Sequence, residues 1–236
     1  MIVLKKRNIV IAAALILTAI TFVLCFAALT NTGTAATVSG VKIVLDAGHG
    51  GIDGGVSGIT TGMKESDINL AVVKKLQTYL KDAGLSVVLT RNSEAGLYGV
   101  ASSTLKKRDM QKRKEIIEKA QPTLIVSVHM NYYPNSSRRG GQVFYRKDSE
   151  SSAVLARSMQ NSLNDLYQDV KDYSPLTGDY YMLNCTDYTS VIAECGFLSN
   201  PVDEALLITD EFQSELAYSL FRGIIDYLTE SSIVYF

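Results

Sequence analysis

The chain contains only two histidines, and each follows an apolar run. His49 stands in a glycine-rich segment, and His129 ends the mostly apolar run Leu124–His129. Two imidazoles and one carboxylate are a common ligand set for catalytic zinc, which leaves a fourth position for water. A second carboxylate, away from the metal, is then needed to move protons. Glu65 and Glu194 both qualify, and spacing alone does not decide which is the ligand and which the base.

The placement of the histidines favours a metal site over simple packing. A single histidine is more often a hydrogen-bonded core residue than a ligand. Here both follow predicted strands, and open α/β sheets bind ligands beyond the carboxyl ends of their strands. A dinucleotide-binding loop is the competing interpretation of the glycines around His49. That loop requires an acidic residue near the end of the second strand, where Thr90 and Arg91 stand.

Strand-like and helix-like segments alternate from Val41 onward. Short apolar runs predict five strands, at Lys42–Asp46, Ser86–Thr90, Leu124–His129, Gly141–Tyr145 and Val191–Glu194. Apolar residues at helical spacing predict four helices, at Glu65–Ala83, Leu105–Lys119, Ser151–Leu166 and Phe212–Leu228. The alternation predicts one α/β domain over residues 41–230, a mostly parallel twisted sheet with helices on both faces.

The N-terminus has the pattern of an export signal. A basic start, Met1–Arg7, precedes an uncharged apolar run over residues 9–29. The run is longer than a usual signal core of about 7–15 residues and close to the ~20 that span a bilayer. Small residues at 34–36 suit cleavage, whereas retention would leave a membrane anchor with its basic end inside. We expect residues 1–30 to be a signal or anchor, residues 31–40 a linker, and the domain to be exported.

Charge and cysteine content exclude other classes of protein. Basic residues number 23 and acidic residues 24, a net charge of −1, which offers no strong field for nucleic acid. Beyond the apolar run only Cys185 and Cys195 remain, too few for a disulfide scaffold. Pairing of these two stays open, but packing as small buried residues is the expectation. Cys195 is a poor nucleophile candidate, because no histidine is free to activate it if both bind metal.

The residues in four short motifs resemble a known family. They are Asp46-Ala-Gly-His49-Gly-Gly, Lys64-Glu65, Ser127-Val-His129-Met-Asn131 and Glu194-Cys-Gly-Phe197-Leu-Ser-Asn200. In this order they resemble the zinc-dependent N-acetylmuramoyl-L-alanine amidases, over about Val41 to Leu228. The resemblance implies an α/β fold with His49, Glu65 and His129 as zinc ligands and Glu194 as the catalytic glutamate. It also implies hydrolysis, in peptidoglycan, of the amide between the lactyl group of N-acetylmuramic acid and L-alanine.

Within that family the chain looks most like the germination-specific amidases of spore formers. These are short, begin with a hydrophobic segment and lack wall-binding modules. The likeness implies action on glycan strands with stem peptides, as the first step towards muramic-δ-lactam in spore cortex. It places the protein on the outer face of the cytoplasmic membrane or around the forming spore. The sequence does not indicate whether a protein activator takes part.

Two other functions remain in view. A zinc peptidase acting on the stem peptide would differ in its products, because an amidase releases an intact stem peptide with a free L-alanine amino terminus. A non-catalytic peptidoglycan-binding module would need no proton shuttle at Glu194.

Several polar and aromatic residues near the motifs have two interpretations each. Asp46 and Asn131 fit groups that orient metal-bound imidazoles, and equally a turn residue and an end cap. Arg113 is expected to point inward from a helix whose lysines face solvent, and Asp53 has only a turn role. Four tyrosines suit either a sugar-binding groove or loop packing: Tyr132, Tyr133, Tyr180 and Tyr181.

Overall fold

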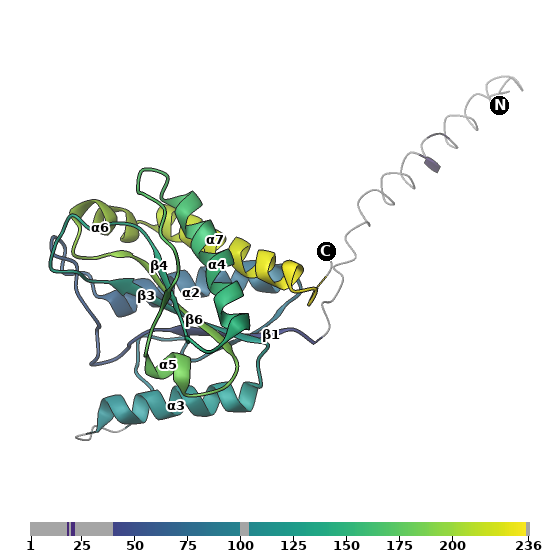
Figure 1. Cartoon of the computed structure of the whole chain (residues 1–236), viewed down its shortest axis with the longest axis horizontal. Coiled ribbons are helices and arrows are strands. Elements are labelled where there is room, and N and C mark those ends of the chain that lie inside the picture. The colour runs from purple at the N-terminus through teal and green to yellow at the C-terminus, as the bar shows by residue number, and fades with distance from the viewer. Residues whose placement is uncertain (1–17, 19, 22–39, 100–103, 235–236) are drawn as a thin grey trace, which may run out of the picture. The chain divides into compact units, whose positions relative to one another are not determined.

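The computed structural model describes residues 18, 20–21, 40–99 and 104–234 (Figure 1). The expected signal or anchor segment and the linker lie almost wholly outside these residues. Within the described ranges, no helix combines the length and apolar character needed to cross a bilayer. The predicted domain falls in the compact unit Thr37–Phe236.

A six-stranded sheet forms the centre of this unit, in the order β2-β1-β3-β6-β4-β5. Its strands are β1 (Lys42–Ala47), β2 (Ser86–Leu89), β3 (Leu124–Asn131), β4 (Gln142–Tyr145), β5 (Leu176–Thr177) and β6 (Thr189–Phe197). The neighbouring pairs among β2, β1, β3 and β6 are parallel. β4 runs antiparallel to β6, and β5 parallel to β4. The predicted mostly parallel sheet is confirmed, with one reversal at β4.

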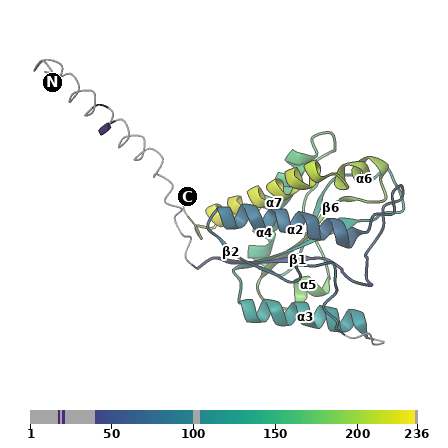
Figure 2. The ribbon, with the colours of Figure 1, turned by 180° about the vertical axis from the view of Figure 1, so that it is seen from behind.

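Helices cover both faces of the sheet, as predicted (Figures 1 and 2). The longer helices on one face are α2 (Glu65–Asp82), α4 (Glu150–Leu166) and α7 (Asp210–Glu230). On the other face lie α3 (Leu105–Ala120) and the single turn α5 (Tyr181–Asn184). The sequence analysis missed β5, α5 and α6 (Pro201–Leu207), because such short elements carry too few residues to show a period.

Strand alternation divides the buried apolar side chains between two cores. Val126 and Val128 of β3 join the larger core, which includes residues of α2, α4 and α7. Ile125 joins a smaller core with Ile117 of α3 and Met182 of α5. Successive strand residues point to opposite faces, so each long central strand is buried on both sides. Cys195 is buried in the larger core and Cys185 is partly exposed, and both are free thiols.

The register between β3 and β6 sets the geometry at the carboxyl edge. His129 pairs with Glu194 and Asn131 with Phe197, with a register shift between the two pairs. One more residue on β6 than on β3 therefore fits between the pairs, as in a β-bulge. β6 runs on to Phe197, so the prediction that this strand ends at Glu194 was three residues short.

Candidate metal centre

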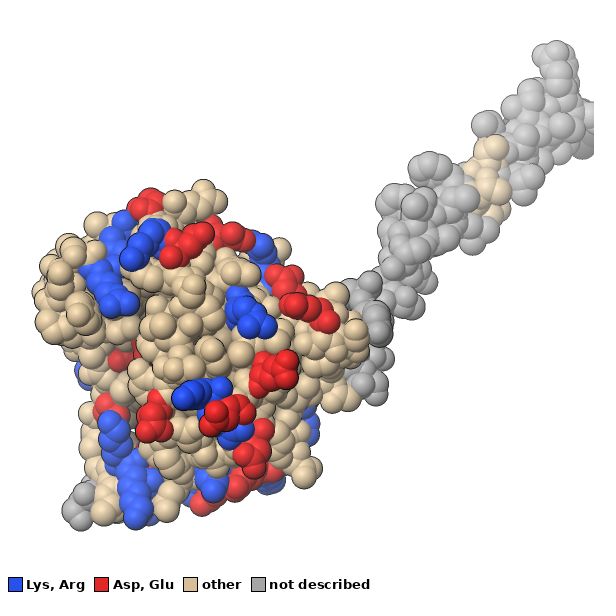
Figure 3. Space-filling model, in the orientation of Figure 1, with Lys and Arg blue, Asp and Glu red and all other residues tan. Residues whose placement is uncertain are grey.

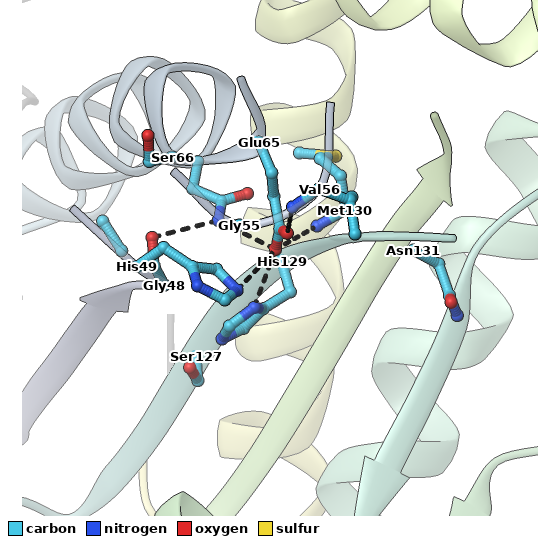
Figure 4. A network of polar contacts seen from close by, with 12 residues as sticks. Gly48, His49, Gly55, Val56, Glu65, Ser66, Ser127, His129, Met130 and Asn131 are labelled. Carbon is cyan, nitrogen blue, oxygen red and sulfur yellow. Dashed lines mark hydrogen bonds and ion pairs between the residues drawn. The ribbon is translucent and has the colours of Figure 1, made fainter. Parts of the chain in front are cut away.

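Three side chains from separate elements converge at the carboxyl edge of the sheet (Figure 4). His49 lies in the loop after β1, Glu65 is the first residue of α2, and His129 is on β3. Glu65 Oε1 lies 3.3 Å from His49 Nε2 and 2.9 Å from His129 Nδ1. One ligand atom from each residue falls within 4.8 Å of the others. Two imidazole nitrogens and one carboxylate oxygen at this spacing fit a catalytic zinc ion with one open position.

Glu65 is fixed in place by backbone donors. Its side chain is buried, and it accepts hydrogen bonds from the amides of Val56 (3.0 Å) and Met130 (3.2 Å). Asn69, one turn along α2, adds a donor at 3.3 Å. Burial by itself raises the pKa of Glu65, but hydrogen bonds and charge from the two imidazoles outweigh it and hold the pKa far below its usual range. The carboxylate is therefore ionised, as a metal ligand must be.

Two glycines make room for this approach. A Cβ at Gly48 would lie 2.2 Å from His129 Cε1, and one at Gly55 would lie 2.3 Å from Glu65 Oε2. Between them His49 adopts a left-handed backbone conformation, with φ of 61°. Such a conformation is uncommon for a residue with a side chain and is often found at functional sites. The glycine-rich loop therefore brings the imidazole to Glu65 at some cost in backbone strain.

Asp53 orients the His49 ring, a role that the sequence analysis did not predict. Its Oδ1 lies 3.0 Å from His49 Nδ1 and also accepts from the amide of Gly55 at 3.2 Å. The turn role is therefore present, and the imidazole contact is added to it. With Nδ1 bonded to a carboxylate, Nε2 is the nitrogen left to face Glu65. A carboxylate four residues after a candidate ligand, in a loop that folds back, was the available signal.

Asp46 and Arg113 form a buried ion pair beneath the histidine loop. Arg113 also donates to the carbonyl of His49 at 2.5 Å, so the expectation that it points inward is correct. Asp46 accepts from the hydroxyls of Thr90 (2.6 Å) and Ser127 (2.5 Å) rather than from an imidazole. Its role is to hold Arg113 and to link β1 to its two neighbouring strands, so the interpretation of Asp46 as an orienting group for a histidine is wrong.

Asn131 does not orient a histidine either. Its Oδ1 accepts from the amide of Tyr132 at 2.8 Å. Figure 4 shows its side chain directed away from the three converging residues. The structure therefore supports the end-cap interpretation of Asn131.

Glu194 lies beside the three converging residues but outside their contacts. Its Oε2 is buried and has no hydrogen-bond partner among the residues that the structure describes. Burial raises its pKa to about 7, with a further rise from Glu65 and opposing effects of the two histidines. An unpaired buried carboxyl lowers the stability of the folded protein, so its presence indicates a functional role. A titrating group near neutral pH suits proton transfer.

A pocket of about 330 Å³ opens in front of these groups. His49, His129 and Glu194 line it, together with Tyr180 and Tyr181. Its apolar floor comes from α3, α5 and β6, through Met110, Met182 and Ile192.

Comparison with known proteins identifies the family of this site. Residues 43–226 match the N-acetylmuramoyl-L-alanine amidase family. The chain belongs to this family. The amidase is 34% identical, over 197 residues, to the germination-specific N-acetylmuramoyl-L-alanine amidase of Bacillus subtilis (strain 168), and the match covers 82% of each chain. It is thus an enzyme of the amidase class, and its substrate is peptidoglycan.

Solved structures resemble the amidase over most of its length. The CwlD amidase from Clostridioides difficile, solved in complex with the GerS lipoprotein, matches with a TM-score of 0.77 and 34% identity. That match covers 80% of this chain and 99% of the other. The catalytic domain of the amidase CwlV, from Bacillus (Paenibacillus) polymyxa var. colistinus, matches with a TM-score of 0.69 and 28% identity, over 80% and 98% of the two chains.

Proposed function

We propose that the domain over residues 41–230 is a zinc-dependent amidase in which His49, Glu65 and His129 hold the metal. The convergence of two imidazole nitrogens and a buried carboxylate on one point carries the proposal. Three ligands of these types, with room on the pocket side, suit catalytic zinc better than a closed structural site. Membership of the amidase family supports the same assignment.

In the proposed reaction Glu194 moves the protons. Zinc, when bound, would supply positive charge that polarises the scissile carbonyl and lowers the pKa of water. Glu194 takes a proton from the attacking water and delivers it to the amine nitrogen of the leaving L-alanine. Its pKa of about 7 suits both acceptance and donation. Asp53 keeps His49 oriented throughout.

The pocket suits the sugar that carries the scissile group. Tyr180 and Tyr181 are partly exposed at its wall, and aromatic rings with polar tips suit groups that are apolar on one side and hydroxylated on the other. An apolar floor would receive the methyl groups of an N-acetylated, lactyl-bearing sugar. We therefore place the muramic acid in this pocket.

The cellular role is proposed from the relatives. The germination-specific B. subtilis amidase supports a role in spore cortex, where stem-peptide removal would precede muramic-δ-lactam formation. The C. difficile complex with a lipoprotein supports a protein partner for this chain too. Residues 1–30 would serve as signal or membrane anchor, and residues 31–40 as linker, so that the enzyme acts outside the cytoplasmic membrane.

Muropeptide analysis tests the proposed function. The purified protein loaded with zinc should release intact stem peptides with a free L-alanine amino terminus, as identified by mass spectrometry. Chelation should stop the release, and zinc should restore it. Shortened stem peptides still attached to muramic acid would instead establish a peptidase. Binding to peptidoglycan without any product would establish a binding module.

A further inference from the structure

Arg138 is held among three aromatic rings at the carboxyl edge of the sheet. Its guanidinium carbon lies 5.2 Å from the centre of the Tyr133 ring and 5.8 Å from those of Tyr173 and Phe197. Lys171 Nζ adds a second cation, 5.5 Å from the Tyr173 ring. Stacking of this kind fixes the plane of a guanidinium and leaves its N–H edge available for bonds.

The charge of Arg138 is not neutralised by the protein. Four other arginines each pair with a carboxylate: Arg113, Arg139, Arg146 and Arg222. Within the described part of the chain, no carboxylate lies within ion-pair distance of Arg138. Asp169 and Asp203 both pair with the neighbouring Arg139. A half-buried, oriented guanidinium without an acidic partner is a typical carboxylate-binding group.

The strand register places Arg138 close to the proposed catalytic groups. Phe197, under the guanidinium, pairs with Asn131, whereas Glu194 pairs with His129. Asn131 and His129 are two residues apart on β3. Two strand residues span roughly 7 Å. An extended peptide covers about 3.3–3.6 Å per residue, so a chain leaving the scissile bond along this edge reaches Arg138 within two or three residues.

We propose that Arg138 binds a free carboxylate of the stem peptide, just beyond the L-alanine whose amide is cleaved. The inference rests on the proposed amidase function and adds the direction in which the stem peptide extends from the scissile amide. The sugar occupies the pocket beside Tyr180 and Tyr181, and the peptide crosses Glu194 towards Phe197 and the ring of Tyr133. Arg138 is thus a specificity residue, which selects acidic stem peptides.

A cycle of two enzymes and two substrates tests this inference. The substrates are muramyl peptides that differ only in one group near the alanine, a free carboxylate or the corresponding carboxamide. Arg138→Gln removes the charge but keeps a planar group for the aromatic rings. We expect KM for the carboxylate substrate to rise about 10-fold or more, with kcat little changed, because a charge-assisted bond present before and during reaction contributes uniform binding. For the carboxamide, KM should change less than about 2-fold.

The design separates folding and function from the inference. Loss of folded protein would lower turnover of both substrates equally. The matched control is Arg157→Gln, which replaces an exposed arginine of α4. Arg138→Lys should recover part of the loss for the carboxylate substrate. Equal effects of Arg138→Gln on both substrates would overturn the role of Arg138 and leave the amidase function standing. Failure of the unaltered enzyme to cleave either substrate would overturn both.

Discussion

His49 shows how strongly single residues of the site are constrained. Its backbone is left-handed, its Nδ1 contacts Asp53, its Nε2 faces Glu65, and its carbonyl accepts from Arg113. The contacts of the ring restrict its orientation, and those of the backbone fix the position from which the side chain extends. Pre-organisation of this kind reduces the entropy lost when the ring binds a ligand.

Loss of Asp53 should weaken metal binding without abolishing it. We expect Asp53→Ala to lower zinc affinity about 10–100-fold, because groups that orient a ligating imidazole typically contribute that much. Asp53→Asn, which keeps an acceptor for Gly55, should lose less. Zinc titration with a competing chelator measures both, with Asp187→Ala, an exposed partner of Arg146, as control. Unaltered affinity in Asp53→Ala would show that its contact with His49 is incidental.

The two glutamates should give opposite results in metal analysis. Glu65→Ala should bind no stoichiometric zinc, because it removes one of three ligands. Glu194→Gln should keep zinc and lose about 10²–10⁴ in rate, the usual contribution of a general acid–base. Metal content and turnover on muropeptides are measured on the same samples. A zinc-free Glu194→Gln together with a fully loaded Glu65→Ala would mean that the roles are exchanged.

At the scale of elements, α3 supports the site from the face opposite α2. Arg113 reaches from α3 to Asp46 on β1 and to the carbonyls of Ala47 and His49. Arg91, after β2, donates to the carbonyls of Ala47 (2.8 Å) and Gly48 (3.0 Å). Two buried guanidinium groups thus donate hydrogen bonds to the backbone carbonyls of the loop that carries His49. Without them, these carbonyl groups would be buried and unpaired.

Breaking the buried pair should cost much more than breaking a surface pair. Arg113→Met leaves Asp46 buried without its cation, and we expect a loss of about 3–5 kcal/mol in the free energy of unfolding. Lys112→Met, which removes an exposed pair with Glu115 on the same helix, should change it by less than about 1 kcal/mol. Urea unfolding measures both. Similar small losses in the two variants would contradict a structural role for Arg113.

The same pair predicts a dependence of stability on pH. Burial alone would raise the pKa of Asp46, but Arg113, Ser127 and Thr90 outweigh it and lower the pKa from 3.8 to about 2. A carboxyl with a depressed folded pKa stabilises the protein above its unfolded pKa and loses that contribution as pH falls. At about 1.4 kcal/mol per pKa unit, the contribution is about 2 kcal/mol. The stability difference between the unaltered protein and Asp46→Asn should therefore shrink between pH 4 and 2, and a constant difference would argue against this pairing.

At the scale of the whole molecule, charge is spread without a dominant sign. Figure 3 shows acidic and basic side chains interspersed over the visible face, in keeping with a net charge of −1. Such a surface gives little long-range attraction to polyanions. We therefore expect recognition of the substrate to depend on the local groups around the pocket and, in our proposal, on Arg138.

Export is the prediction that belongs to the whole chain. Cell fractionation should recover the enzyme outside the cytoplasmic membrane, either free or membrane-bound, because the basic start and apolar run have the pattern of an export signal. Immunodetection against the domain, with a cytoplasmic marker protein as control, measures the distribution. Recovery of a soluble cytoplasmic chain that retains its first thirty residues would contradict the prediction.

Local patterns in the sequence are enough to predict the order and type of the long elements. Apolar runs such as Lys42–Asp46 and amphipathic periods such as Glu65–Ala83 are local patterns, so they indicate strands and helices before any contact is known. Because ligands bind beyond the carboxyl ends of the strands in open α/β sheets, the two histidines that follow strands, His49 and His129, are expected at one edge. Separation of ligand from base came from the likeness to the family, since nothing local to Glu65 or Glu194 distinguishes them.

The contacts among these residues could not be predicted from the sequence, because they form only when distant segments pack together. The contact between Asp53 and His49 depends on how a glycine-rich loop folds back, and the position of Glu194 depends on the pairing of β6 with β3, which sets Glu194 opposite His129. The stacking of Arg138 joins rings that lie far apart in the chain. Contacts between residues far apart in the chain leave no repeating pattern in the sequence from which they could be predicted. They are fixed by close packing and by the need to satisfy buried polar groups, which exist only once the chain has folded.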